Sequence, residues 1–467
     1  YTYYAPGNYV VTLRLPNDVK SVSARDALIH YDDFNNDSCL KKIYSLNLLW
    51  TFGKGSSLFN GSGITYVHPN VFNNEWLEHQ NYTQDNLGIA TFKDCTDLTS
   101  AEITIPKKIT STNSMFNNCK NLIKTLKIIP NTVTDASYMF NDCVRLKDFP
   151  IIELGGTKPL NLYSCFRGAG SVIQGKFSIS HITIPKNANN CYDMFSACSQ
   201  ISNLPMFELG YIRDENGEII RLNTRGMFWK CHNLEEISKT TFPSRIIDAT
   251  CMFQDCIWVT KITSRFENDE VLDYDESYTP AILDDKENKM ILRGMFLGCN
   301  KLKDASEFVI PKNNRFVLNG MFANCTSLIN SPKIHKECNA LSFRSLFDYN
   351  AKLSVLNFDD IPTTAINYSY MFRNCHSLTK APWFRNDTFD NSAKYTIDCQ
   401  YMFAVCKVLT GFIKDYTQLK APINTKYNGC FDVCTKLTEA LKFNIGEKFY
   451  NYMEIGMMYR GCNSLKN

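Results

Sequence analysis

The chain has 467 residues, of which 44% are hydrophobic and 21% charged, and this ordinary composition excludes a wholly disordered chain. Its formal net charge of +3 is too small to predict attraction to nucleic acid or to an anionic membrane. No apolar run approaches the roughly 18 residues that cross a bilayer, so we expect no membrane insertion of this segment.

Residues 1–49 lack the pattern that fills the rest of the chain. Residues 9–15 alternate like a strand and lead into a turn sequence at 16–18. We interpret 1–49 as an N-terminal cap or the end of a preceding β domain. Because the first residue is Tyr1 and the last repeat has no polar closing segment, we expect a piece of a longer protein, truncated at its C-terminal end.

From residue 50 to 467 one pattern recurs: an aromatic residue, cysteine three residues later and leucine or a similar residue three after that. The twelve aromatic and cysteine pairs are Phe92/Cys95, Phe116/Cys119, Phe140/Cys143, Phe195/Cys198, Phe228/Cys231, Phe253/Cys256, Phe296/Cys299, Phe322/Cys325, Phe372/Cys375, Phe403/Cys406, Phe431/Cys434 and Tyr459/Cys462. Three further units, at Phe59, Phe166 and Phe347, have Ser62, Ala169 and Asn350 at the cysteine position. The spacing of three predicts a short helical turn whose aromatic, cysteine and leucine side chains share one face.

The second half of each unit predicts a short strand. Residues 102–106, 181–185 and 307–311 alternate polar and apolar residues and end in proline, which cannot donate to a ladder. In other units a proline would begin the strand, at Pro150, Pro205, Pro332 and Pro382. Since such a unit buries its apolar face only by stacking, residues 50–467 predict a leucine-rich-repeat solenoid with one short parallel strand and one short helical turn per coil, in about fifteen coils.

Nineteen cysteines occur in the chain, mostly at the repeat position. We expect them to be free thiols packed in the core, because free cysteine is among the most buried residue types. Disulfides between neighbouring coils are the alternative. No Cys-x-x-Cys pair is present to indicate zinc, and we predict no cofactor and no metal site.

The units resemble the BspA-like leucine-rich repeat family of surface proteins, whose repeats carry Met-Phe-x-x-Cys-x-x-Leu. Residues 138–143 (Tyr-Met-Phe-Asn-Asp-Cys) and 370–382 are typical examples. The resemblance implies an extracellular or cell-surface location and adhesion to host proteins, other cells or glycans. Similar repeats in phage proteins leave a virion surface as the alternative location.

Two long spacers interrupt the cadence. Residues 211–221 predict a β-hairpin that turns on Asn216-Gly217. The stretch Glu267 to Lys289 is acidic, with aspartates at 273, 275, 284 and 285 that could chelate a hard cation, but its spacing does not fit an EF-hand. We therefore interpret this stretch as a protruding solvated loop and leave cation binding open.

No nucleophile elbow, phosphate-binding loop or zinc-protease helix occurs, so we predict no catalytic residues and no enzyme. Tryptophans are the best guide to a binding surface. Trp229 and Trp258 lie in the turns of successive units, away from the inward stripe, and Trp383 follows Pro382 at a strand start. The alternative for all three is that they cover the core at irregular coils.

These features predict a non-catalytic recognition or adhesion module that binds a protein or glycan on another cell or host surface through a solenoid face and its insertions. The alternative is a structural subunit or rigid spacer of a larger extracellular or virion assembly, such as a phage fibre.

Overall fold

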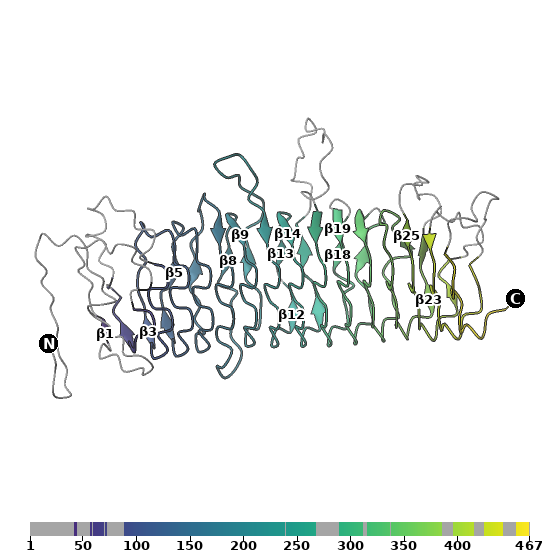
Figure 1. Cartoon of the computed structure of the whole chain (residues 1–467), viewed down its shortest axis with the longest axis horizontal. Helices are drawn as coiled ribbons and strands as arrows, with labels where there is room; N and C mark the ends of the chain where they lie inside the picture. Colours follow the sequence, from purple (N-terminus) through teal and green to yellow (C-terminus); the bar gives the residue numbers. More distant parts are fainter. Residues whose placement is uncertain are drawn as a thin grey trace, which may run out of the picture.

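The computed structural model describes residues 42–43, 57, 59–69, 71, 88–238, 240–267, 289–311, 315–336, 338–384, 396–414, 425–441 and 454–466. Within these ranges the chain forms short coils stacked in one elongated row, from the earliest coils at one end to the last at the other (Figure 1). All strand pairs between coils are parallel, and none of the described residues is helical. The predicted solenoid of stacked parallel strands is thereby confirmed.

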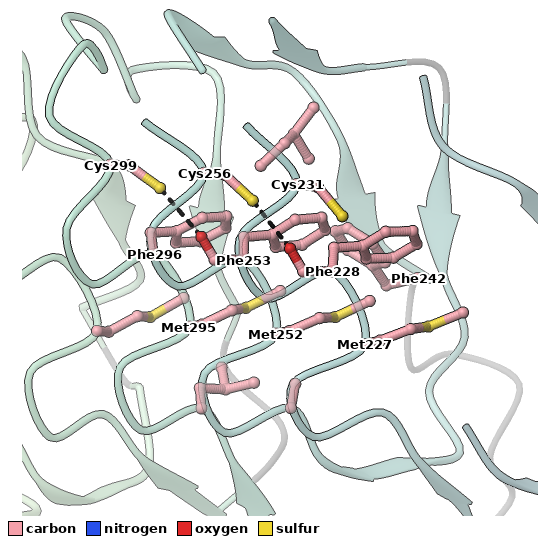
Figure 2. Packing of buried hydrophobic residues seen from close by; sticks show 14 of the residues in the cluster. Met227, Phe228, Cys231, Phe242, Met252, Phe253, Cys256, Met295, Phe296 and Cys299 are labelled. Atoms are coloured by element: carbon pink, nitrogen blue, oxygen red, sulfur yellow. Dashed lines mark hydrogen bonds between the residues drawn. The ribbon is translucent and has the colours of Figure 1, made fainter. Parts of the chain in front are cut away.

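Fifteen aromatic rings form an unbroken stack through the interior, one ring per repeat unit. It runs from Phe59 to Tyr459 with successive ring centroids 5.0–5.9 Å apart. Figure 2 shows three of these rings, Phe228, Phe253 and Phe296, between a column of methionines and a column of cysteines. The hydrophobic spacing seen in the sequence therefore becomes a set of parallel columns that bury one another.

The cysteine column is held by hydrogen bonds between coils. In all twelve cysteine units the thiol donates to the carbonyl oxygen of the aromatic residue in the preceding coil, at 2.8–3.3 Å. In the unit of Phe347 the amide of Asn350 makes the same bond to Phe322, at 2.9 Å. The cysteines among the described residues are free, and most are fully buried, as the packing interpretation predicts.

The predicted helical turn is wrong in its geometry. In every one of the fifteen units the residues two before and two after the aromatic residue have φ between 49° and 75°, as at Ser114 and Asn118 on either side of Phe116. The amide of Asn118 then donates to Asn141 of the next coil at 2.8 Å, while Cys119 donates back to Phe116 at 3.1 Å. Left-handed residues prevent the segment from continuing as a helix and direct alternate amides toward the neighbouring coil.

Each coil has up to three strand positions after its aromatic residue, rather than the single one predicted. The first comprises β1 Lys42–Ile43, β2 Tyr66–Val67, β3 Ser100–Ala101, β4 Lys124–Thr125, β12 Glu236–Ile237, β15 Lys261–Ile262, β23 Lys380–Ala381 and β26 Gly411–Phe412. The second comprises β5 Ile128–Ile129, β6 Ile151–Ile152, β8 Thr183–Ile184, β10 Met206–Phe207, β13 Thr241–Phe242, β16 Arg265–Phe266, β18 Val309–Ile310, β20 Lys333–Ile334, β22 Asp360–Ile361 and β24 Trp383–Phe384. The third comprises β7 Leu160–Asn161, β9 Ala188–Asn190, β11 Leu222–Asn223, β14 Ile246–Asp248, β17 Lys289–Ile291, β19 Arg315–Val317, β21 Ala340–Ser342, β25 Ile397–Asp398 and β27 Thr425–Lys426.

The sheets at the three positions differ in length. The third position carries a seven-stranded sheet, β21-β19-β17-β14-β11-β9-β7, which isolated bridges extend in both directions. The first position carries a four-stranded sheet from β1 to β4 and shorter ladders further on, so strand ladders span fewer coils than the ring stack. Within the described ranges, the ladders at the second position are two-stranded.

The predicted proline positions are largely confirmed. Pro185 and Pro311 follow β8 and β18, whereas Pro150, Pro205, Pro332 and Pro382 precede β6, β10, β20 and β24. The expected strand at 102–106 is the exception, because this segment pairs with no neighbour.

The hairpin predicted around Asn216 is confirmed. An antiparallel bridge joins Arg213 to Ile219, and Gly217 adopts φ 80° in the turn. The acidic stretch is described only at its ends, where the Glu267 carboxylate accepts the amides of Gly210 and Ser244. Residues 268–288, with their aspartates, lie outside the described residues, as do 1–49 apart from β1, so the cap and the cation site stay predictions.

Arg245 is an unexpected buried cation, 1% exposed. Its guanidinium donates to the carbonyl oxygens of Ala188 at 2.7 Å and Pro185 at 2.9 Å, two coils away. Arg245 thereby joins the two coils that lie on either side of the coil carrying the hairpin at residues 211–221. Burial lowers the pKa of this guanidinium to about 10.

Candidate functional site

Trp229 and Trp258 lie on the outer edge of the turns in neighbouring coils. The indole Nε1 of Trp229 donates to the carboxylate of Asp255 at 3.2 Å, and the ammonium of Lys230 lies 4.6 Å from the centre of a Trp229 ring. Trp258 is 50% exposed, and the ammonium of Lys301 from the next coil lies 5.6 Å from its ring centre. Three consecutive coils therefore contribute two tryptophans and two lysines to this edge, which we call the tryptophan edge.

Trp383 lies elsewhere, in the interior. It is 2% exposed on β24, where both residues of the strand are buried, and its ring packs against Phe403, Phe431 and Tyr427. This burial fits the interpretation of a tryptophan that covers the core. Trp383 is therefore not part of the tryptophan edge.

Three tyrosines and Arg373 further along the turns form a second set that the sequence did not single out; Tyr349 is exposed and the others are partly buried. Tyr370 and Tyr401 stack with centroids 5.6 Å apart and planes 3° apart. The guanidinium of Arg373 lies 4.5 Å from the ring centre of Tyr370 and 5.0 Å from that of Tyr349. The sequence feature that could have indicated this set is the position of the two stacked tyrosines, each of which lies two residues before a phenylalanine of the ring stack.

An ion pair fixes the arginine of this set. Arg373 donates to both carboxylate oxygens of Asp348, at 3.0 and 2.6 Å. Burial raises the pKa of the Asp348 carboxyl, an effect that Arg373 opposes, and the same contact raises the pKa of Arg373. Because the pair is bidentate, it orients the guanidinium over the tyrosines rather than leaving it free to rotate.

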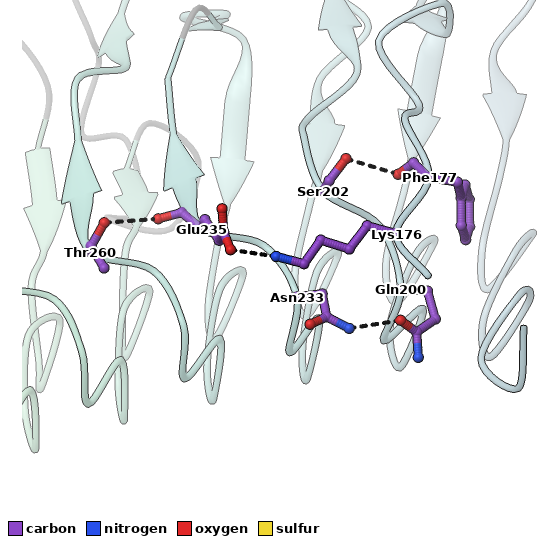
Figure 3. Close-up of polar contacts among 7 residues, drawn as sticks. All are labelled: Lys176, Phe177, Gln200, Ser202, Asn233, Glu235 and Thr260. Carbon is purple, nitrogen blue, oxygen red and sulfur yellow. Dashed lines mark hydrogen bonds and ion pairs between the residues drawn. The ribbon is translucent and has the colours of Figure 1, made fainter. Parts of the chain in front are cut away.

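Polar side chains also connect coils on the surface near the tryptophan edge. Lys176 pairs with the carboxylate of Glu235, while Asn233 donates to the side chain of Gln200 at 2.8 Å (Figure 3). The Lys176–Glu235 contact joins the coils of Phe166 and Phe228 across the coil between them. Such contacts support the edge without adding a reactive group.

The repeat cysteines are unsuited to nucleophilic catalysis, since burial raises the pKa of Cys95 to about 11 and those of Cys325 and Cys406 to about 12. Cys462, in the last described coil, differs: a hydrogen bond with Cys434 lowers its pKa. Among the described residues, no cluster of three or more histidine, cysteine or acidic side chains could hold a metal. Over the same part of the chain, no helix has the length and apolar character of a membrane span.

A family model described as "BspA type Leucine rich repeat region (6 copies)" matches residues 65–202 and 281–395, slightly more than half of the chain. The chain therefore belongs to the BspA-type leucine-rich-repeat proteins. A search of curated proteins finds no relative of this sequence.

Three solved structures are similar to the chain at low identity. A leucine rich cell surface protein from Faecalibacterium prausnitzii is 18% identical, with 76% of this chain and 82% of that chain covered and a TM-score of 0.35. Leucine-rich repeat proteins from Bacteroides ovatus (16% identity, 70% and 86% coverage, TM-score 0.26) and Eubacterium ventriosum (16%, 79% and 84%, 0.33) are also similar. The family assignment rests on the sequence match alone.

Proposed function

We propose that this chain is a non-catalytic recognition module that acts outside the cell or on its surface and binds a protein or glycan through the tryptophan edge. Membership of the BspA-type family supports a repeat module, and the neighbour from Faecalibacterium prausnitzii is described as a cell surface protein. The observation that carries the proposal is the half-exposed indole of Trp258, beside Lys301 and one coil from Trp229.

The chemistry of the edge suits such a partner. An exposed indole offers a large, rigid apolar face that can cover an apolar side chain or the C–H face of a sugar, at little cost in side-chain entropy. Lys230, Asp255 and Lys301 surround the indoles with hydrogen-bonding groups of both charges. A rigid solenoid keeps these groups in register, so the edge is ordered before the partner arrives.

The test is a binding screen of the whole chain against a glycan array and a panel of immobilised extracellular proteins. We expect at least one saturable interaction that Trp258→Ala weakens tenfold or more, because it removes the most exposed aromatic anchor. Ile366→Ala is the matched control, since Ile366 is 48% exposed but lies in the coil of Phe347, two coils beyond the coil of Lys301. If Trp258→Ala and Ile366→Ala bind equally well, the tryptophan edge is not the binding surface.

A further inference from the structure

The ladders at the second strand position join coils in pairs. They are β5–β6, β8–β10, β13–β16, β18–β20 and β22–β24. In all five the first strand is followed directly by proline, and in four of them the second strand is preceded by proline, β16 being the exception. The proline positions therefore distinguish two kinds of strand, which we call leading and following strands.

In the β5–β6 and β8–β10 pairs the following strand supplies three groups to its leading strand. In the β5–β6 pair the amides of Ile151 and Glu153 donate to the carbonyls of Lys127 and Ile129, at 3.0 and 2.9 Å. The carboxylate of Glu153 then accepts the amide of Asn131 at 3.0 Å. In the β8–β10 pair the equivalent bonds are Met206 to Ile182, Glu208 to Ile184, both 2.9 Å, and Lys186 to the Glu208 carboxylate, also 2.9 Å.

Residues 103–106 have the sequence of a leading strand without a following one. Ile103, Ile105 and Lys107 occupy the places of Lys127, Ile129 and Asn131 in the next coil. The next coil, however, carries the leading strand β5 instead of a following strand. Among the described residues, none donates a hydrogen bond to the carbonyls of Ile103 and Ile105, and no carboxylate accepts the amide of Lys107.

A groove opens where the following strand is missing. Its volume is about 640 Å³, which is in the range of ligand-binding pockets. Ile103, Ile105 and Ile128 form its apolar walls. Its charged lining residues are Lys107, Lys108, Lys127, Glu102 and Glu153. Ile103 and Ile105 are only 2% and 4% exposed. Because a buried carbonyl without a hydrogen-bond partner costs free energy, these two carbonyls favour a bound donor.

We propose that this groove binds an extended peptide strand of another protein by β-augmentation, with the pattern Pro-x-(Ile or Phe)-Glu that β6 and β10 share. The peptide amides would meet the free carbonyls of Ile103 and Ile105, as β6 meets β5. The apolar residue would cover the isoleucines, as Ile152 and Phe207 are buried at 4% and 6% in β6 and β10. The glutamate would accept the amide of Lys107, and the lining favours its charge because Lys107, Lys108 and Lys127 outnumber Glu102 and Glu153.

The probe is a labelled peptide with the sequence of residues 148–154, Asp-Phe-Pro-Ile-Ile-Glu-Leu, titrated against the whole chain by fluorescence anisotropy. We expect saturable binding that falls at least tenfold when the peptide is N-methylated at its first isoleucine, because that amide would meet the carbonyl of Ile103. Glu153→Lys in the peptide is expected to cause a similar loss.

On the protein, Ile128→Trp should fill the groove and weaken peptide binding at least tenfold. Met206→Trp is the matched control, because Met206 is equally exposed on β10 (44% against 45%) and lies outside the groove. Circular dichroism checks that both variants fold. Should Ile128→Trp fail to fold, Lys107→Glu decides, since it places a like charge beside the peptide's glutamate.

The proposal is overturned if the peptide does not bind, if N-methylation has no effect, or if both tryptophan variants bind alike. Self-association of the chain that Ile128→Trp abolishes would assign the groove to a second copy and would equally overturn it. Trp258→Ala should leave peptide binding unchanged, so this test and that of the tryptophan edge can fail independently.

Discussion

At the residue scale, the repeat cysteine serves as a hydrogen-bond donor as well as a filler of the core. A thiol is small and weakly polar, so it fits beside the ring stack and still reaches the carbonyl of the preceding coil. Asn350 supports this interpretation, because it replaces the thiol with an amide that makes the same bond. Ala169 is the one replacement that cannot donate.

Cys256→Ala tests the contribution of one such thiol. The thiol donates to Phe228 at 3.1 Å (Figure 2), and its loss removes this bond and leaves a small cavity. We expect the free energy of unfolding to fall by about 1–2 kcal/mol, measured by urea denaturation.

Cys251→Ala is the control for this change, since Cys251 is only partly buried and lies outside the cysteine column. We expect it to cost less than about 0.5 kcal/mol. Equal losses for the two variants would contradict a specific role for the thiol-to-carbonyl bond.

At the element scale, the backbone conformation of the turn could not be predicted from the spacing of its buried residues. The spacing of Phe116, Cys119 and Leu122 correctly placed all three side chains inside, but a spacing of three does not distinguish a helical turn from one with left-handed residues. The missed signal lies two residues after the aromatic, where ten of fifteen units have residues that tolerate φ > 0. They are Gly61, Asp94, Asn118, Asp142, Gly168, Asp255, Gly298, Asn324, Asn374 and Gly461.

The strands and the candidate site were predictable to different degrees. Proline positions correctly located strand starts and ends, because proline's missing donor is a local property. Pairing was not predictable, since whether residues 103–106 meet a following strand depends on the next coil. Trp229 and Trp258 could be placed on the turns from their offset to phenylalanine, whereas the burial of Trp383 depends on packing against Phe403 and Phe431.

Val405 provides a test of the left-handed position. It adopts φ 64° two residues after Phe403, although a β-branched side chain is strained there. Asn occupies the equivalent place at 118, 324 and 374. We expect Val405→Asn to raise the free energy of unfolding by about 1 kcal/mol, measured by urea denaturation.

The matched control is Val408→Asn, because Val408 is another partly buried valine of the same coil with no left-handed φ. We expect this second exchange to be neutral or destabilising. A stabilisation of equal size at both positions would show that the gain comes from replacing an apolar side chain with a polar one and not from relief of backbone strain.

At the scale of the whole molecule, the solenoid is a set of columns in which each coil contacts mainly its neighbours. The ring stacking and the thiol-to-carbonyl hydrogen bond recur from coil to coil. A change in solution conditions that weakens one of these hydrogen bonds therefore weakens all of them. The exposed sites, in contrast, are local: the tryptophan edge and the groove arise where one coil differs from its neighbours.

Alkaline pH is a condition that acts on the whole cysteine column. Burial raises the thiol pKa to about 11 in Cys95 and about 12 in Cys325 and Cys406, whereas an unfolded cysteine titrates near about 8.5. At a pH above the pKa of the unfolded thiol, the folded state binds more protons than the unfolded state. The stabilisation that these thiols provide is therefore fully present below about pH 8.5 and is lost as the pH rises toward the pKa of the folded thiol. Over that pH range each such thiol lowers the free energy of unfolding by up to about 1.4 kcal/mol per pH unit.

We therefore expect the urea midpoint to fall steeply between about pH 9 and pH 11, because several buried thiols titrate together in the unfolded chain. Thiolate absorbance in the ultraviolet, followed alongside circular dichroism, provides the check specific to cysteine. For the buried column it should appear only as the native signal is lost. Full thiolate absorbance with an intact native signal would mean that the column tolerates charge, and the hydrogen-bonded thiol could not then be what holds neighbouring coils together.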